Sequence, residues 1–152
     1  MTIRAIAWDV DGTLVDSEPL HLRSLQHVCA AYSVDIADLP DETFVGLHIL
    51  DVWAVLQPRF SGQVTRADWL DLLNAYFVTN AATVASTPGA FEVVAHFASV
   101  GILQCAVSNS NRVVVNANLE AADLSQFMMF TISLDDVVRG KPDPEPYRRA
   151  LS

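Results

Sequence analysis

The chain has 152 residues, enough for one compact domain or a core with a small insertion, but not for two full-sized domains. It is 51% hydrophobic and 18% charged, with a mean hydropathy of +0.28, which argues against a disordered chain. Nine basic and eighteen acidic side chains leave a net charge of −9, the opposite sign to a surface that binds nucleic acid. We therefore expect a globular protein with no nucleic-acid partner.

Targeting and redox signals are weak in this sequence. The most apolar long stretch, 91–107, is interrupted by charged and polar side chains, unlike a membrane-spanning helix. The N-terminal apolar run, 3–8, is too short for a signal peptide. Cys29 and Cys105 have apolar neighbours, as expected of small core residues in a reducing compartment. These features predict a cytoplasmic protein with no membrane partner.

The first predicted element is a strand, because residues 3–8 form a nearly continuous apolar run that ends at Asp9. The stretch 17–87 that follows has no convincing strand and is far longer than an ordinary connection. It carries three amphipathic helical patterns, the third with a capping-box-like start at Thr65 and Asp68. Their apolar positions are Leu22, Leu25, Cys29 and Tyr32; Ile49, Val52, Trp53 and Leu56; and Trp69, Leu72, Leu73, Tyr76 and Phe77. We expect an inserted helical bundle; one continuous mixed domain is the alternative.

The rest of the chain alternates helices with strands. A helix is predicted at about 88–101, a strand at 102–107, a helix around 114–119 and a strand at 128–132. Short apolar runs of this kind are typical of parallel strands covered on both faces. The apolar faces of the two helices comprise Phe91, Val94, Ala95 and Ala98, and Val114, Ala117 and Leu119.

This alternation predicts an α/β fold with a three-layer, Rossmann-like parallel sheet. The predicted core comprises residues 1–16 and 88–152, and the helical insertion comprises 17–87. Polar residues follow all three predicted strands. Because ligands of open α/β sheets bind at the carboxyl ends of the strands, we expect the functional site there.

An acidic pair follows the first strand. Asp9 and Asp11 are two residues apart, so strand alternation places them on the same side, and Gly12 permits a sharp turn. One carboxylate can attack as a nucleophile while the other transfers a proton. Both also offer the hard oxygen ligands that Mg²⁺ prefers. An ordinary Asp-Gly turn is the alternative interpretation.

Two further polar motifs follow the other strands. Ser108, Asn109 and Ser110 combine hydroxyls with backbone N–H groups at a helix start, an arrangement that binds phosphate; simple helix capping is the alternative. Lys141 is the only lysine beside eight arginines and lies in a loop rich in Gly and Pro. Its ammonium group could neutralise a phosphoryl oxygen and an attacking carboxylate. A solvated loop lysine is the alternative.

In this order, the motifs resemble those of the haloacid dehalogenase-like (HAD) superfamily, especially the phosphatase branch that includes phosphoglycolate phosphatases and β-phosphoglucomutases. The resemblance covers essentially the whole chain. The motifs that carry it are Asp9-x-Asp11-Gly-Thr-Leu-x-Asp16-Ser17-Glu18, Thr87-Pro88-Gly89, Val107-Ser108-Asn109-Ser110 and Gly140-Lys141-Pro142-x-Pro144. It implies an Mg²⁺-dependent phosphatase that hydrolyses a small phosphorylated metabolite of the sugar phosphate or phosphoglycolate type.

The resemblance also implies roles for single residues. Asp9 would attack the substrate phosphorus and become an aspartyl phosphate, and Asp11 would protonate the leaving alcohol and then activate water. Lys141 would pair with Asp9 and the phosphoryl group. We assign phosphate binding to Ser108, Asn109, Gly12 and Thr13, and Mg²⁺ binding to Asp9 and the backbone carbonyl of Asp11.

The inserted helices would form the α-helical cap of this family, which closes to exclude water. The residues expected near its substrate face are Glu18, His21, Gly46, His48 and Asp51, with a plain surface position as the alternative for His48 and Asp51. The sequence stops at Ser152, before the further strand whose acidic residues complete the Mg²⁺ shell in family members. We therefore expect a C-terminally truncated core whose first strand is left at the sheet edge.

Two other functions stay open. One is a truncated, catalytically impaired chain that acts as a binding subunit or self-associates through the uncovered sheet edge. The other is a β-phosphoglucomutase-like phosphotransferase. The resemblance implies a cap lysine for a mutase, and the only lysine here is Lys141, outside the cap. Phosphatase activity is therefore the preferred prediction.

Overall fold

The computed structural model describes residues 3–40, 43–44 and 47–152. The chain divides into two compact units: Met1–Ser17 with Ala81–Ser152, and Glu18–Asn80. We refer to them as the core unit and the helical unit. Their second boundary falls after Asn80, whereas the predicted one falls after residue 87. Each unit is described by itself.

The core unit contains a parallel sheet in the order β1-β4-β5. Its strands are β1 (Ala5–Trp8), β4 (Leu103–Val107) and β5 (Thr131–Ile132). The prediction of a parallel α/β sheet is confirmed, but β5 is shorter than the predicted strand at 128–132. The residues before β5 still pair with β4, because the Met129 N–H donates to the Gln104 carbonyl at 2.8 Å. Among the described residues, β1 has a neighbouring strand on one side only.

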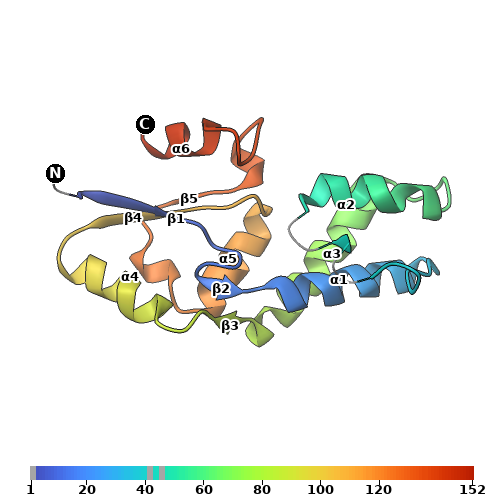
Figure 1. Ribbon diagram of the computed structural model, residues 1–152, viewed down its shortest axis with the longest axis horizontal. Coiled ribbons are helices and arrows are strands. Elements are labelled where there is room, and N and C mark those ends of the chain that lie inside the picture. Colours follow the sequence, from blue (N-terminus) through green and yellow to red (C-terminus); the bar gives the residue numbers. More distant parts are fainter. Residues whose placement is uncertain (1–2, 41–42, 45–46) are drawn as a thin grey trace. The chain divides into compact units, whose positions relative to one another are not determined.

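Helices cover both faces of this sheet (Figure 1). Helices α4 (Ala90–Ser99) and α5 (Arg112–Ala121) lie on one face, and α6 (Glu145–Ala150) lies on the other. Strand alternation explains the division, since successive residues of β4 point to opposite faces. Ala106 packs in the cluster under α4 and α5, while Cys105 and Val107 pack with Ile132 on the face of α6.

A two-stranded antiparallel ribbon also belongs to the core unit. It pairs β2 (Val15–Asp16) with β3 (Ala85–Ser86), and the Thr87 N–H donates to the Leu14 carbonyl at 3.0 Å. The prediction that 17–87 contains no strand is therefore wrong. Both residues of β3 are exposed, so this strand has no apolar pattern to reveal it. These contacts hold the segment before α4 on the core unit.

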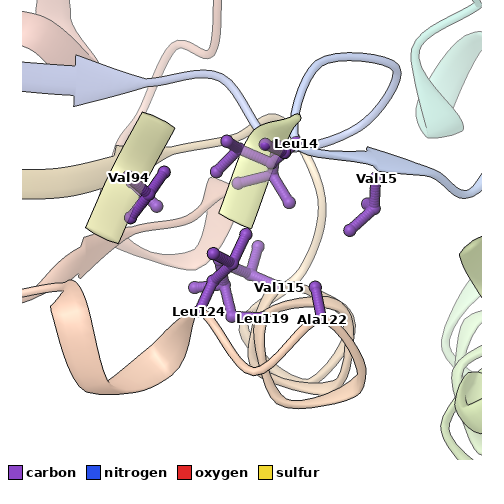
Figure 2. Close-up of a cluster of buried hydrophobic side chains, with 10 residues drawn as sticks. Leu14, Val15, Val94, Val115, Leu119, Ala122 and Leu124 are labelled. Carbon is purple, nitrogen blue, oxygen red and sulfur yellow. The ribbon is translucent and has the colours of Figure 1, made fainter. Parts of the chain in front are cut away.

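The loop after β1 is anchored in the core cluster under α4 and α5 (Figure 2). Val10, Leu14 and Val15 are almost completely buried, and they pack against Val94 of α4 and against residues of α5. Each such side chain contributes roughly 1.5–3 kcal/mol on burial. The predicted apolar face of α4 is only partly right, since Val94 is buried and Phe91 is 42% exposed. The acidic pair thus stands on a loop fixed by apolar packing.

The helical unit contains the three predicted helices, α1 (Glu18–Ala31), α2 (Ile49–Leu56) and α3 (Arg66–Asn80). Its core includes packed aromatic rings, with Trp53 stacked on Phe60 and tilted against Trp69. The predicted capping box is present: the Asp68 N–H donates to the Thr65 hydroxyl, and the Thr65 N–H donates back to the Asp68 carboxylate, each at 3.2 Å.

Short 3₁₀ turns complete both units: η2 (Gln57–Arg59), η3 (Ala81–Thr83), η4 (Ser125–Phe127) and η5 (Leu134–Asp136). In the described part of the chain, no helix is both long and apolar enough to span a bilayer. The two cysteines are buried and unpaired, as predicted. Burial raises the pKa of the Cys29 thiol to about 11, against a smaller lowering by Arg59, so this thiol is a core group.

Candidate active site

Asp9 and Lys141 form an ion pair at the carboxyl end of the parallel sheet. The Lys141 Nζ donates to Asp9 Oδ1, and it also donates to the carbonyl of Val107, the last residue of β4, at 2.9 Å. The other carboxylate oxygen of Asp9 accepts a hydrogen bond from the Thr13 hydroxyl at 3.1 Å. The Asp9 side chain is 42% exposed and that of Lys141 only 19%. The carboxylate is thus open to a ligand, while the ammonium group is held close to it.

The loop that carries the acidic pair is a tight turn. The Val10 carbonyl accepts hydrogen bonds from three successive N–H groups, those of Thr13, Leu14 and Val15. Gly12 has φ +73°, in the left-handed region that favours glycine, and its N–H donates to the Val15 carbonyl at 2.8 Å. The Asp-Gly step therefore permits the sharp turn predicted from the sequence.

The Asp11 carboxylate accepts hydrogen bonds from side chains of several segments. Its Oδ1 accepts hydrogen bonds from the Ser17 hydroxyl (2.7 Å) and the Asn118 amide (2.9 Å). Its Oδ2 accepts them from the Ser108 hydroxyl (2.9 Å) and the Ser110 hydroxyl (3.0 Å). Three of these donors, Ser17, Ser108 and Asn118, are at most 2% exposed. The Asp11 carboxylate thus joins the first motif loop, the second motif loop and helix α5.

The second motif loop is folded on itself. The Ser108 hydroxyl donates to Asp11 and accepts a hydrogen bond from the Ser110 N–H at 2.9 Å. Asn109 points instead to the lysine loop, where its Oδ1 accepts from the Lys141 N–H (2.7 Å) and its Nδ2 donates to the Lys141 carbonyl (2.8 Å). Both polar atoms of the Asn109 side chain are therefore engaged with the Lys141 backbone.

The sequence-predicted core residues are thus brought together, and three further residues join them. Ser17, Ser110 and Asn118 contact Asp11 but were not among the assigned site residues. Ser17 and Ser110 lie inside the quoted motifs. Asn118 had a fainter signal: it is a polar residue on a helix face that carries buried Val114, Val115 and Leu119. A fully buried amide on such a face needs a polar partner.

The predicted substrate-facing residues of the insertion belong to the helical unit. Glu18 is the exposed first residue of α1, and the ring of His21 packs against Phe77 with centroids 4.6 Å apart. His48 caps helix α2, because its Nδ1 accepts a hydrogen bond from the Leu50 N–H at 3.2 Å. Gly46 lies outside the described residues. The cap role of these residues stays a prediction.

The hard oxygen donors of the first motif fit Mg²⁺. Within the described residues, no three His, Cys, Asp or Glu side chains are grouped closely enough to hold a metal ion. Mg²⁺ keeps several waters, however, and commonly takes one or two carboxylates together with substrate phosphate oxygens. The Asp9 carboxylate, with 42% of its side chain exposed, is compatible with that ligand set.

A parallel sheet with an acidic pair, a serine and a lysine at its carboxyl ends places the chain among α/β enzymes. The family profile of haloacid dehalogenase-like hydrolases matches residues 6–152. The chain therefore belongs to the haloacid dehalogenase-like hydrolase family. Members of the family generally depend on Mg²⁺.

Among curated proteins, the chain is similar to pyrophosphatase PpaX from Oceanobacillus iheyensis, with 27% identity over 155 residues. The match covers 99% of this chain and 69% of that protein. Among solved structures, it is similar to CbbY from Rhodobacter sphaeroides in complex with phosphate, with a TM-score of 0.84, 27% identity, and 99% and 72% of the two chains covered. A CbbY mutant in complex with xylulose-(1,5)bisphosphate matches with a TM-score of 0.83 and 26% identity, over the same shares of the two chains.

Proposed function

We propose that this chain is an Mg²⁺-dependent phosphomonoesterase that hydrolyses a small phosphorylated metabolite through an aspartyl phosphate on Asp9. The observation that carries the proposal is the Asp9–Lys141 ion pair beside the Asp11–Ser108 hydrogen bond. Phosphoryl transfer requires positioning and neutralisation of charge more than it requires covalent chemistry. These four side chains supply both at one edge of the sheet.

Asp9 is the proposed nucleophile because its carboxylate is accessible and oriented from two sides. Lys141 holds one oxygen and Thr13 the other. Two anions repel when a carboxylate approaches a phosphoryl group, and the Lys141 ammonium lowers that repulsion. The bond that forms joins an Asp9 oxygen to phosphorus, and the bond that breaks joins phosphorus to the leaving alcohol oxygen. Water then cleaves the aspartyl phosphate and releases inorganic phosphate.

Asp11 is the proposed acid and base of the two steps. It donates a proton to the leaving alcohol and then takes one from the attacking water. Its carboxylate oxygens accept hydrogen bonds from Ser17, Asn118, Ser108 and Ser110. In the proposed reaction, it exchanges at least one of them for a substrate or water oxygen. The released Ser108 hydroxyl is then available to bind the phosphoryl group.

Mg²⁺ would be held by Asp9 and the backbone carbonyl of Asp11, and it would supply positive charge to the phosphoryl oxygens. Gly12, Thr13 and the Ser108 loop are the proposed phosphate-binding elements. The Gly12 and Thr13 N–H groups donate to the Val15 and Val10 carbonyls in this structure, so they would exchange those hydrogen bonds to reach a phosphate. The helical unit is the proposed cap, with Glu18, His21 and His48 as candidate contacts to the leaving group. Exclusion of bulk water by such a cap would strengthen the electrostatic interactions with the phosphoryl group.

The proposed substrate class is a sugar phosphate or phosphoglycolate. The relatives suggest which other substrates to compare with these, since PpaX is called a pyrophosphatase and one CbbY structure holds xylulose-(1,5)bisphosphate. A panel of phosphoglycolate, sugar monophosphates, xylulose bisphosphate and pyrophosphate therefore tests it. The proposal expects the highest kcat/KM with a monoester, and faster turnover of pyrophosphate would contradict the substrate class.

The primary experiment measures hydrolysis of nitrophenyl phosphate by the purified chain, with Mg²⁺ and with a chelator. We expect turnover that needs Mg²⁺, and a loss of at least about 10³-fold in kcat for Asp9→Asn because the nucleophile is removed. Asp11→Asn should lose about 10²- to 10⁴-fold, the usual contribution of a positioned acid or base. The exposed helix residue Asp71 offers a matched control, and Asp71→Asn should keep wild-type turnover. Turnover that persists in Asp9→Asn would refute the mechanism.

The two alternatives make different predictions in the same experiment. A β-phosphoglucomutase-like enzyme would interconvert sugar phosphates without net release of phosphate, and the sequence holds no lysine besides Lys141. A binding or self-associating chain would show no turnover and a dimeric mass in solution. The pairing edge would be β1, which among the described strands has a neighbour on one side only. Phosphate release by a monomer supports the phosphatase and contradicts both.

A further inference from the structure

We propose that Asn109 is a positioning residue that fixes the backbone of Lys141, and that its side chain is not a phosphate ligand. The inference rests on the proposed function for its catalytic consequence, but its structural content can be tested without turnover. It revises the assignment of Asn109 to phosphate binding made from the sequence.

The carboxamide of Asn109 makes a two-point contact with one residue. Its Oδ1 accepts the Lys141 N–H at 2.7 Å, and its Nδ2 donates to the Lys141 carbonyl at 2.8 Å. The pair of bonds copies the pattern by which neighbouring strands exchange an N–H and a carbonyl. Two bonds from one rigid amide set the position and the orientation of the Lys141 peptide groups together, which a single bond would not.

The lysine is held at its other end too. Nζ donates to the Val107 carbonyl at 2.9 Å and pairs with Asp9. Val107 and Asn109 are two residues apart at the end of β4, so both restraints on Lys141 come from the same strand end. A flexible four-carbon side chain on an unanchored loop would pay a large entropy cost to hold one position. The Asn109 contact removes the backbone part of that freedom.

Gly140 provides an independent sign that the contact is tight. A Cβ added at residue 140 would lie 2.5 Å from Asn109 Oδ1 and 3.1 Å from Asn109 Cγ. The third of the three nearest atoms is Leu134 Cδ1 at 3.2 Å, the end of a flexible side chain. The φ of Gly140 is outside the left-handed region, so glycine is not required there by the backbone. What excludes a larger residue at 140 is therefore the Asn109 carboxamide.

Because Lys141 is the only lysine in the sequence, the accessibility of its amine can be measured by chemical modification. The intact protein is treated briefly with an amine-acetylating reagent, and the peptide that contains Lys141 is quantified by mass spectrometry, apart from the N-terminal amine. We expect Asn109→Ala to speed acetylation of Lys141 severalfold. Asn109→Asp keeps the oxygen but loses the donor, so it should give an intermediate rate. Asn116→Ala, at an exposed asparagine of α5, is the matched control and should keep the wild-type rate.

A double-mutant cycle separates this contact from a general loosening of the loop. Gly140→Ala should speed acetylation in the wild-type background, because the new methyl group displaces the Asn109 carboxamide. In the Asn109→Ala background the same substitution should add little, since its obstacle is gone. Equal effects of Gly140→Ala in both backgrounds, or an unchanged rate in Asn109→Ala that is folded by circular dichroism, would overturn the proposal.

The kinetic constants distinguish positioning from phosphate binding. A positioning role predicts that Asn109→Ala lowers kcat at least about tenfold, with KM for nitrophenyl phosphate nearly unchanged, because the ammonium group acts in the transition state. If the Asn109 side chain bound the phosphoryl group in the ground state, Asn109→Ala would instead raise KM and leave kcat unchanged. Failure of the phosphatase assay for the wild type would refute the proposed function, while the acetylation rates would still decide the role of Asn109.

Discussion

The carboxylate of Asp135 caps helix α5 from a distant part of the chain, since its Oδ2 accepts a hydrogen bond from the Arg112 N–H at 2.7 Å. Its Oδ1 accepts another from the Asn111 side chain at 2.9 Å. A carboxylate in this position accepts a hydrogen bond from a free N–H of the first helical turn. Its negative charge also interacts favourably with the positive end of the helix dipole. Because α5 begins directly after the loop of Ser108, the contact ties that loop to the segment after β5.

Removing this cap should weaken the core unit. We expect Asp135→Ala to lower the free energy of unfolding by about 1 kcal/mol, the usual cost of losing a capping side chain. Asp135→Asn keeps an oxygen acceptor and should cost less. Urea denaturation followed by circular dichroism measures both. Equal stability of Asp135→Ala and the wild type would show that the cap is not stabilising.

Gln104 is a buried amide that links three elements. Its Oε1 accepts from the Trp8 indole N–H of β1 at 2.8 Å, and its Nε2 donates to the Val94 carbonyl of α4 at 3.0 Å. Gln104→Leu would leave the half-buried indole N–H without its partner, at a cost of roughly 1–3 kcal/mol. Adding Trp8→Phe to Gln104→Leu should reduce that cost, because it removes the unpaired indole N–H. Purely additive effects in a denaturation-based cycle would contradict this role, and exposed Gln26→Leu is the control.

Asn118 faces a carboxylate from inside the core. Replacing its amide by a carboxylate in Asn118→Asp would set two acidic groups together at a site with no exposure. Like charges at that distance raise the free energy of the folded state, so the melting temperature should fall at neutral pH and partly recover in mildly acidic buffer. Asn118→Leu also loses the hydrogen bond but should show no such recovery. Thermal unfolding of both variants at two pH values tests the difference.

Asp136 should make the core unit sensitive to acid. Burial alone would raise its pKa, but hydrogen bonds from the Ser133 N–H and hydroxyl and the charges of Arg112 and Arg149 hold the pKa below its ordinary value of 3.8. A carboxyl group with a lowered folded-state pKa stabilises the protein above its unfolded pKa, and this stability is lost as the pH falls through the folded-state value.

The loss should therefore occur below pH 3.8. Asp136→Asn cannot titrate, so its free energy of unfolding should fall less steeply than that of the wild type over that range. Urea titrations at a series of acidic pH values give both curves. Parallel curves would mean that other groups account for the acid response.

Substitutions of Trp69 should change the stability of the helical unit. Its side chain is completely buried, and its indole Nε1 is one of the buried polar atoms for which the described residues provide no hydrogen-bond partner. Trp69→Ala should cost about 3–5 kcal/mol through the cavity it leaves. Trp69→Phe keeps a ring against Trp53 and removes the unpaired N–H, so it should cost much less. A Phe variant as unstable as the Ala variant would point to an unrecognised partner of the indole.

The elements that could be predicted are those whose signal is local. The runs before Asp9 and Ser108 are continuous and apolar, and the helix around Trp53 has a regular apolar face, so period alone identifies them. In α3 the buried residues Trp69, Leu73 and Phe77 recur at intervals of four. Strand β3 could not be predicted in this way. It has two exposed residues, and it exists because Thr87 and Ser86 meet the segment around Val15 in space.

The sequence by itself determined the sheet, the order of its motifs and the types of residue at the carboxyl ends of its strands. Strand periodicity and the polar residues that follow each strand are properties of neighbouring positions. Only the tertiary structure decided what each side chain contacts: Asn109 binds the Lys141 backbone 32 positions away, and Asn118 reaches Asp11 across 107 positions. Hydrogen bonds depend on distance and angle between atoms, and for residues this far apart in the chain these are fixed only when the strands and helices pack together.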